Sequence, residues 1–185
     1  MAESSSNSLR LGSPLPDVRL VDATDGGMVD VGALAVGKRG TLVAFICNHC
    51  PYVVHMRAEL VRLGHEALDL GFGVFAINSN DARTYPQDGP EAMARLARSE
   101  KWRFPFLFDE SQAVARAFDA QCTPDLYLFD ARATLAYHGQ LDDSRPSNGK
   151  PLTGRDLRAA IDAVAAGRAP AADQKPSVGC SIKWR

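Results

Sequence analysis

Two cysteines separated by two residues, Cys47 and Cys50, form the most reactive pattern in the 185-residue chain. They follow an apolar run that ends at Ile46 and precede a segment from Pro51 with the apolar spacing of a helix. Two thiols at this spacing can close a small disulfide ring. A thiolate on Cys47 would face the unpaired N–H groups and positive dipole end of the helix, which lower the pKa of a cysteine. The pattern therefore predicts a redox dithiol in which Cys47 attacks a disulfide and Cys50 resolves the product.

A histidine, His49, lies between the two cysteines. If protonated, it would stabilise the Cys47 thiolate, which favours the reduced dithiol and makes the disulfide more oxidising. Metal binding is the alternative use of these residues. A structural zinc site normally takes a second ligand pair, and the sequence has no second C-x-x-C and no H-x3-H. A donor set of Cys47, Cys50, Cys122 and either His49 or His55 stays open.

The sequence Cys122-Thr123-Pro124 places a proline at the head of a strand, just after a helix. Next to a dithiol, this pattern favours a cis-proline loop, although only about 5–6% of X-Pro bonds are cis in general. Such a loop would present the backbone of Thr123 to the dithiol, so that a substrate peptide could pair with Thr123 and Pro124 as an added strand. Cys122 would then lie beside Cys47 as a third redox thiol, a metal ligand or a small buried hydrophobe.

The fourth cysteine, Cys180, lies five residues from the C-terminus. It is a second candidate for a third redox thiol, because a tail cysteine can resolve a sulfenic acid or mixed disulfide on Cys47. We favour the alternative of an inert thiol, held in place as Val178, Ile182 and Trp184 pack on the domain.

The composition indicates a globular protein, with 45% hydrophobic residues, 23% charged residues and a net charge of -1. The charge balance predicts no binding to nucleic acid or to anionic membranes. The sequence has no apolar run of the roughly 18 residues that a membrane helix needs. The N-terminus lacks the apolar core of a secretory signal, so we expect a cytoplasmic protein. In a reducing compartment, four cysteines indicate redox or metal chemistry. We expect no cofactor.

Apolar periodicity divides the chain into alternating strands and helices. We expect a disordered N-terminus at 1–13, one domain at 14–169 and a tail at 170–185 that packs on the domain. The fold class is therefore α/β, a mixed sheet with helices on both faces and a β-hairpin before it. The sequence predicts extended segments at 18–21, 28–31, 41–46, 72–77, 104–109, 126–129 and 134–138, and helices at 51–70, 90–101, 111–118 and 156–166.

Three features together resemble a known family: C-N-H-C-P-Y-V from Cys47, Thr123-Pro124 before a strand, and the closing G-C-S-I-K-W from Gly179. With the order of elements, they resemble the thioredoxin fold over roughly residues 12 to 185. More narrowly, they resemble the peroxiredoxin-like branch of the alkyl hydroperoxide reductase/thiol-specific antioxidant (redoxin) superfamily. The resemblance implies a cis-proline at Pro124 that faces the dithiol, and an N-terminal hairpin typical of that branch. The His49 position resembles that of strongly oxidising disulfide-forming enzymes.

The chain departs from two patterns of that superfamily. Peroxiredoxins carry P-x-x-x-T-x-x-C, but Val43 to Ile46 contain neither Pro nor Thr, which argues against efficient peroxidase activity. Thioredoxin carries a Trp before its first cysteine and a buried acid on the preceding strand, where this chain has Ile46 and Thr41.

We therefore expect a thiol–disulfide oxidoreductase. Its expected partners are a disulfide-bearing protein or a small thiol substrate, and a thiol electron donor such as thioredoxin or glutathione. A peroxiredoxin-like thiol peroxidase that acts through Cys47 is the first alternative. A metal-binding thioredoxin-like protein that uses Cys47, Cys50 and Cys122 is the second.

Overall fold

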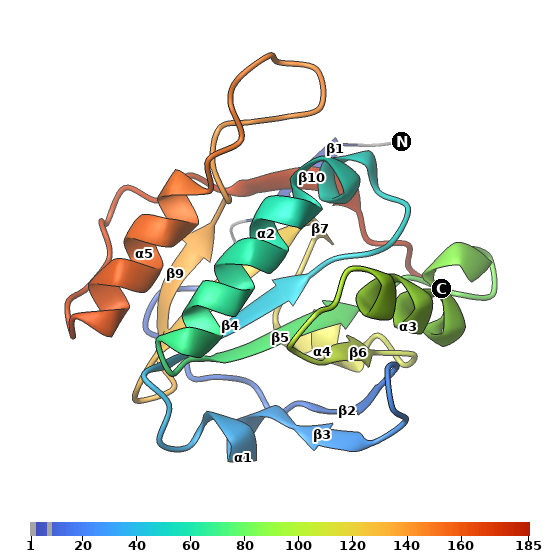
Figure 1. Cartoon of the computed structure of the whole chain (residues 1–185), viewed down its shortest axis with the longest axis horizontal. Helices are drawn as coiled ribbons and strands as arrows, with labels where there is room; N and C mark the ends of the chain where they lie inside the picture. The colour runs from blue at the N-terminus through green and yellow to red at the C-terminus, as the bar shows by residue number, and fades with distance from the viewer. Residues whose placement is uncertain (1–2, 7–8) are drawn as a thin grey trace.

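The computed structural model of the chain describes residues 3–6 and 9–185, and its centre is a mixed β-sheet (Figure 1). Its strands are β2 (Arg19–Asp22), β3 (Met28–Asp30), β4 (Gly40–Phe45), β5 (Gly73–Asn78), β6 (Phe106–Phe108), β8 (Asp125–Asp130) and β9 (Leu135–Gly139). Within the described residues, the sheet order is β3-β2-β6-β5-β4-β8-β9. The strands β4, β5 and β6 run parallel, and the hairpins β2–β3 and β8–β9 add antiparallel strands at the two edges.

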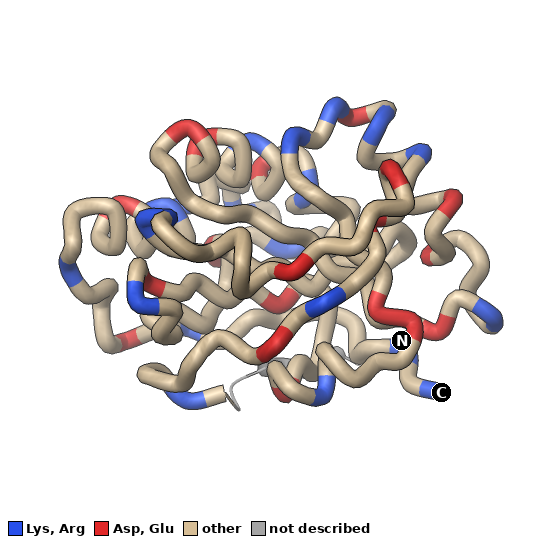
Figure 2. The backbone as a smooth tube through the Cα atoms, turned by 90° about the horizontal axis from the view of Figure 1, so that it is seen from below, with Lys and Arg blue, Asp and Glu red and all other residues tan. Residues whose placement is uncertain are grey.

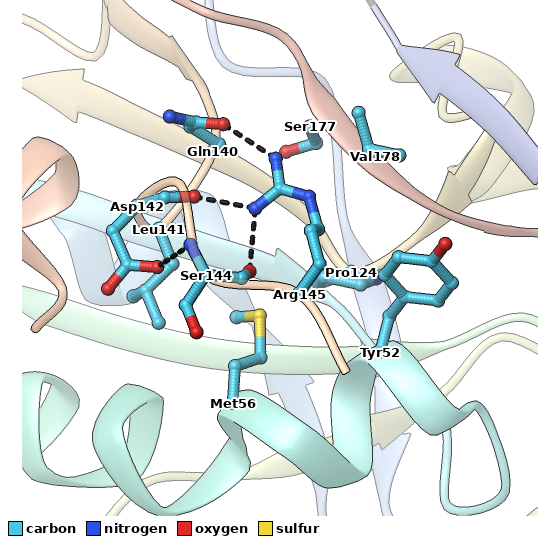
Figure 3. Close-up of a pocket in the computed structure, with 10 residues that line it drawn as sticks. All are labelled: Tyr52, Met56, Pro124, Gln140, Leu141, Asp142, Ser144, Arg145, Ser177 and Val178. Carbon is cyan, nitrogen blue, oxygen red and sulfur yellow. Dashed lines mark hydrogen bonds between the residues drawn. The ribbon is translucent and has the colours of Figure 1, made fainter. Parts of the chain in front are cut away.

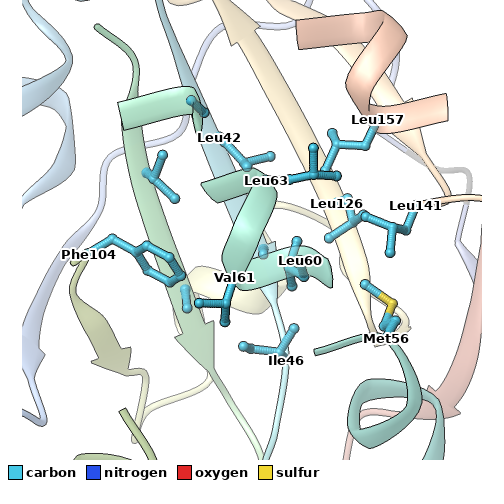
Figure 4. Close-up of a cluster of buried hydrophobic side chains, with 14 of the residues drawn as sticks. Leu42, Ile46, Met56, Leu60, Val61, Leu63, Phe104, Leu126, Leu141 and Leu157 are labelled. Carbon is cyan, nitrogen blue, oxygen red and sulfur yellow. The ribbon is translucent and has the colours of Figure 1, made fainter. Parts of the chain in front are cut away.

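Helices cover both faces of this sheet. One face carries α2 (Pro51–Asp69), α3 (Pro90–Ser99) and α5 (Arg155–Ala165), and the other carries the short helices α1 (Val31–Ala35) and α4 (Ala113–Ala117). Successive side chains of β4 alternate between two buried clusters, with Leu42 and Ala44 facing α2 and Val43 and Phe45 facing α4. Figure 4 shows the first cluster, in which leucines of β4, α2, β8 and α5 pack together. The predicted α/β class and the mixed sheet are confirmed.

A second, small sheet holds the two ends of the chain. Strand β10 (Ser177–Ser181) pairs antiparallel with β1 (Glu3–Ser6) on one side and with β7 (Cys122–Thr123) on the other. Residues 3–6 therefore correct the expectation of a disordered segment at 1–13, whose residues 1–2 and 7–8 lie outside the described residues. The pairing uses backbone groups of β10 that would otherwise lie at a sheet edge, so serine-rich β1 needs no apolar pattern to form it.

The surface carries both signs of charge. In the view of Figure 2, acidic and basic residues are interspersed along the described backbone, as expected for a chain with a formal net charge of -1. Among the helices that the structure describes, none is long and apolar enough to cross a membrane.

Candidate active site

The two cysteines lie where β4 ends and α2 begins. Cys47 follows β4 by two residues, and Cys50 is the N-cap residue of α2, which starts at Pro51. Both side chains are buried, with relative exposures of 1% for Cys47 and 0% for Cys50, and both are free thiols. The position corrects one expectation, because the open N-terminus of the helix is next to Cys50, whereas Cys47 lies three residues before the N-cap position.

Thr123 contacts both thiols. The Cys47 Sγ lies 3.4 Å from the Thr123 Oγ1, and the Cys50 Sγ lies 3.1 Å from the Thr123 carbonyl oxygen, to which its thiol form donates. The peptide bond from Thr123 to Pro124 is cis, as the sequence pattern suggested. The structure thus brings Cys47, Cys50, Thr123 and Pro124 together from two distant parts of the chain.

The two thiols are unequal acids. The pKa of Cys50 is lowered to about 4, because the Cys47 thiol donates a hydrogen bond to it and, against the effect of burial, the Cys180 thiol and the Val53 N–H donate as well. The hydrogen bond to Cys50, burial and the negative charge of Asp88 raise the pKa of Cys47 well above its ordinary value. The negative charge of the pair therefore rests on Cys50 and its proton on Cys47, which corrects the expectation of a lowered pKa at Cys47.

We expect the reduced protein to contain a thiolate at neutral pH. A thiol with a pKa of about 4 is ionised above that pH, so the ultraviolet thiolate absorbance should vanish only as the pH falls through about 4. Because this pKa is depressed by folding, the associated stabilisation is fully present above the unfolded thiol pKa of about 8.5 and is lost as the pH falls. Cys50→Ser should remove the acidic transition. An absorbance that appears only near about pH 8.5 would contradict the assignment.

His49 is paired with a buried carboxylate that the sequence analysis did not single out. Its Nδ1 donates to Asp88 Oδ2 over 2.6 Å, and its ring stacks on Tyr85 with centroids 5.2 Å apart. Asp88 is fully buried and also accepts from the Asn48 N–H at 2.8 Å and the Asn80 Nδ2 at 2.9 Å. The negative charge on Asp88 raises the pKa of Cys47. A protonated His49 would therefore have to offset that charge in order to stabilise the Cys47 thiolate. The thiolate-stabilising role of His49 stays a prediction.

A signal for Asp88 was present in the sequence. The parallel strands β4 and β5 end at the same edge of the sheet, so the segment after β5 must run beside the dithiol. The polar run Asn78-Ser79-Asn80 leads from the last residue of β5 into that segment, and all three residues are buried. Asp88 closes the segment within a short 3₁₀ helix, Pro86–Asp88. Polar residues directly after a buried strand are a reason to examine that loop for a site.

The alternative metal site of Cys47, Cys50, Cys122 and either His49 or His55 is not brought together as one set of ligands. The Cys122 thiol donates to the Pro124 carbonyl oxygen over 3.4 Å, and the Nε2 of His55 lies 2.8 Å from the Ser144 Oγ. Among the described residues, potential ligand atoms of Cys47, His49 and Asp88 instead lie within 4.8 Å of one another. Both oxygens of Asp88 already accept protein hydrogen bonds, so we interpret these three residues as a hydrogen-bonded network.

Of the two candidates for a third redox thiol, the structure brings Cys180 to the dithiol. Cys180 lies opposite Thr123 in the ladder of β10 and β7, and its thiol is hydrogen-bonded to Cys50. Burial and that hydrogen bond raise the pKa of Cys180 to about 12, so it stays a protonated donor. Burial and the charge of Asp125 raise the pKa of Cys122. The Cys180 side chain therefore contacts the site, which corrects the expectation of an inert thiol held by packing alone.

Gly179 allows β10 to approach Thr123. A Cβ atom at position 179 would lie 2.1 Å from the Thr123 carbonyl oxygen, the same oxygen that accepts from Cys50. We expect Gly179→Ala to displace β10 or Thr123, to lower the free energy of unfolding by about 1–3 kcal/mol and to slow reactions of the dithiol. Urea unfolding and thiol alkylation rates measure both effects.

The matched control for this substitution is Gly32→Ala. Gly32 is exposed in α1, where a Cβ meets only the Asp30 carboxylate at 3.5 Å. Alanine favours a helix over glycine by about 1 kcal/mol, so this variant should be as stable as the parent or more so. Equal stability of the Gly179→Ala variant and the parent would show that β10 accommodates the methyl group without the displacement argued here.

Comparisons with known proteins bear on the family and the fold of the chain. The family model described as Redoxin matches residues 10–153. The structure of an uncharacterised conserved protein from Geobacillus kaustophilus shares 48% identity, with a TM-score of 0.96, and the match covers 100% of this chain and 97% of that one. A hypothetical protein from Sinorhizobium meliloti 1021 shares 44% identity, with a TM-score of 0.94 and 98% of each chain covered.

More distant structures share the fold. A thiol:disulfide interchange protein of the thioredoxin family from Chlorobium tepidum TLS matches with a TM-score of 0.64 and 16% identity, over 85% of this chain and 99% of that one. At that identity the likeness concerns the fold alone. No curated protein matches the sequence.

Proposed function

The chain belongs to the Redoxin family of thioredoxin-like thiol oxidoreductases, and from that premise we propose that it exchanges disulfides through Cys47 and Cys50. The observation that carries the proposal is the convergence of both sulfurs on Thr123, at 3.4 Å from its hydroxyl and 3.1 Å from its carbonyl oxygen. The lowered pKa of Cys50 supports it further, because thiol–disulfide exchange needs a thiolate.

The first step forms a mixed disulfide. The Cys47 proton passes along its hydrogen bond to Cys50, and the Cys47 thiolate attacks one sulfur of the substrate disulfide. The substrate S–S bond breaks, and the leaving thiolate takes the proton from Cys50. The reaction thus begins with the proton on Cys47 and ends with it on the released thiol, while Cys50 is again a thiolate.

The second step releases the product. The Cys50 thiolate attacks the Cys47 sulfur, the mixed disulfide breaks, and the second substrate sulfur leaves as a thiolate that takes a proton from solvent. One substrate disulfide has been reduced to two thiols, and the protein holds a Cys47–Cys50 disulfide. We propose that a thiol donor such as thioredoxin or glutathione reduces that disulfide.

Peroxide reduction through Cys47 is the rival function, and the contacts described for its sulfur do not favour it. They are with Cys50, the partner of a disulfide, and with the Thr123 hydroxyl, and Val43 to Ile46 contain neither the Pro nor the Thr of the peroxiredoxin pattern. The test compares two reactions of the reduced wild-type protein: turnover of insulin disulfides, and stopped-flow reaction with hydrogen peroxide. We expect turnover of insulin disulfides and a peroxide rate close to that of free cysteine. Fast peroxide reduction without disulfide turnover would overturn the proposal.

A further inference from the structure

A small cleft beside Pro124 contains the guanidinium of Arg145 (Figure 3). Tyr52 and Met56 line it from α2, and Ser177 and Val178 line it from β10. Pro124 follows Thr123, which contacts both thiols, and Tyr52 is only two residues beyond Cys50. A molecule in this cleft would therefore lie against the same proline loop that borders the dithiol.

The Arg145 side chain is half-buried, and uncharged acceptors hold it in place. Its Nη1 donates to the carbonyl oxygens of Asp142 at 2.6 Å and Ser144 at 2.8 Å, and its Nη2 donates to the Gln140 Oε1 at 2.6 Å. In the part of the chain that the structure describes, no carboxylate forms an ion pair with it. Neutral acceptors therefore hold the guanidinium in position, and its positive charge is not paired with a described carboxylate.

Two donors of Arg145 remain for a ligand. A guanidinium has five N–H groups, and the three hydrogen bonds above use both of Nη1 and one of Nη2. The remaining pair, on Nε and Nη2, forms the edge that binds a carboxylate in a bidentate fashion. In Figure 3 this edge is turned away from the acceptors on Asp142 and Ser144.

Among the described residues that line the cleft, the one carboxylate is that of Asp142, and it does not neutralise this edge. It accepts from the backbone N–H groups of Ser144 at 2.8 Å and Gly154 at 2.6 Å, and Figure 3 shows it pointing away from the guanidinium. Burial acts to raise the pKa of Asp142, but the N–H groups of Thr153, Gly154 and Ser144 outweigh it and hold the pKa below its usual value. The anion thus serves to shape the loop from which Arg145 projects.

We propose that this cleft binds the carboxylate of a small disulfide or thiol substrate, with Arg145 as the specificity-determining residue. The proposal rests on the proposed function, because it places the carboxylate beside Pro124 while the substrate sulfur meets Cys47. The aromatic ring of Tyr52 and the side chain of Met56 offer apolar contact for the methylene groups between carboxylate and sulfur.

The test uses three disulfides of similar length and different charge: 3,3′-dithiodipropionate, bis(2-hydroxyethyl) disulfide and cystamine. Rate constants for oxidation of the reduced protein are measured for the wild type, Arg145→Gln and Arg168→Gln. Because a charge-assisted bidentate contact is lost, Arg145→Gln should slow the reaction with dithiodipropionate about tenfold or more. The rate with the neutral disulfide should stay within about twofold and thereby report an intact dithiol.

Arg168 is an exposed arginine beyond α5, so Arg168→Gln removes the same charge without touching the cleft and should leave all three rates unchanged. An equal loss with all three disulfides in Arg145→Gln would mean a structural role and overturn the proposal. Unchanged rates with dithiodipropionate in Arg145→Gln would overturn it as well.

Calorimetric titration with suberate separates this proposal from the function on which it rests. Suberate has the shape of dithiodipropionate with a carbon–carbon bond in place of the disulfide, so it can bind but not exchange. If no disulfide reacts with the wild type, the proposed function fails. Suberate binding then tests the carboxylate site by itself. Binding to the wild type that is lost in Arg145→Gln supports the carboxylate site, and absence of binding to the wild type refutes it.

Discussion

Replacement of Cys47 by serine is expected to reduce disulfide turnover by about a thousandfold or more, to the background rate. Serine keeps the size of the side chain but removes the sulfur that forms the mixed disulfide. Replacement of Cys50 by serine is expected to stop the reaction one step later, because Cys47 still attacks and nothing resolves the product. The Cys50→Ser protein should therefore accumulate as a covalent adduct with the substrate.

Two measurements separate these outcomes. A turnover assay with insulin or a small disulfide gives the rates, and mass spectrometry of the intact protein under non-reducing conditions detects the adduct. Cys122→Ser is the matched control, since the Cys122 thiol is buried and donates to the Pro124 carbonyl oxygen. This variant should reduce the substrate disulfide at the rate of the wild type. Full activity of Cys47→Ser would refute the assignment, and an adduct on Cys47→Ser in place of Cys50→Ser would assign the first attack to Cys50.

The sequence predicted those elements whose buried side chains form a regular pattern along the chain. The unbroken apolar run of β4 and the three- and four-residue spacing of α2 predicted both elements to within a few residues, because each packs on a core. Since Cys47 and Cys50 sit at the junction of these two elements, their approximate placement followed. The hairpins β2–β3 and β8–β9 were also predicted, from Gly-rich or short turns between apolar runs.

The small sheet of β1, β7 and β10 could not be predicted in the same way. Strand β7 has two residues and β1 is three-quarters serine, so neither shows the alternation of apolar and polar residues that indicates a strand in a sequence. What joins them is backbone pairing between residues far apart in the chain, such as Glu3 with Cys180 and Cys180 with Thr123. The contact of Cys180 with Cys50 depends on that pairing, and this is why a packing role seemed the better hypothesis.

The pKa values of the two thiols depend on where α2 begins and on which groups surround each sulfur. A helix that begins at Pro51 exposes its N–H groups to Cys50, and a start three residues earlier would have exposed them to Cys47. The sequence predicted the start of the helix at Pro51, but it does not show the hydrogen bonds from Cys47, Cys180 and the Val53 N–H that lower the pKa of Cys50. The charge of Asp88, from a loop forty residues away, adds to the difference.

Replacement of Asp88 by alanine is expected to lower the free energy of unfolding by about 3–5 kcal/mol, a large part of the 5–15 kcal/mol typical of a whole domain. The side chain is fully buried and accepts hydrogen bonds from Asn48, His49 and Asn80. Alanine would leave these donors without an acceptor at buried and half-buried positions, and each donor left unsatisfied where it is buried costs about 1–3 kcal/mol. Urea unfolding of the reduced protein measures the loss.

Asp88→Asn separates the structural role of this carboxylate from its effect on the dithiol. The amide keeps the shape and one oxygen acceptor, so it should destabilise less than alanine, but it removes the negative charge that helps to raise the pKa of Cys47. The pKa of Cys47 should fall, and alkylation of Cys47 should become faster at a given pH. Asp173→Asn, at an exposed position, removes the same charge and should change neither quantity. An alkylation rate that is the same in Asp88→Asn and in the wild type would show that the Asp88 charge does not reach the Cys47 sulfur, and the carboxylate would then be a structural support of the loop alone.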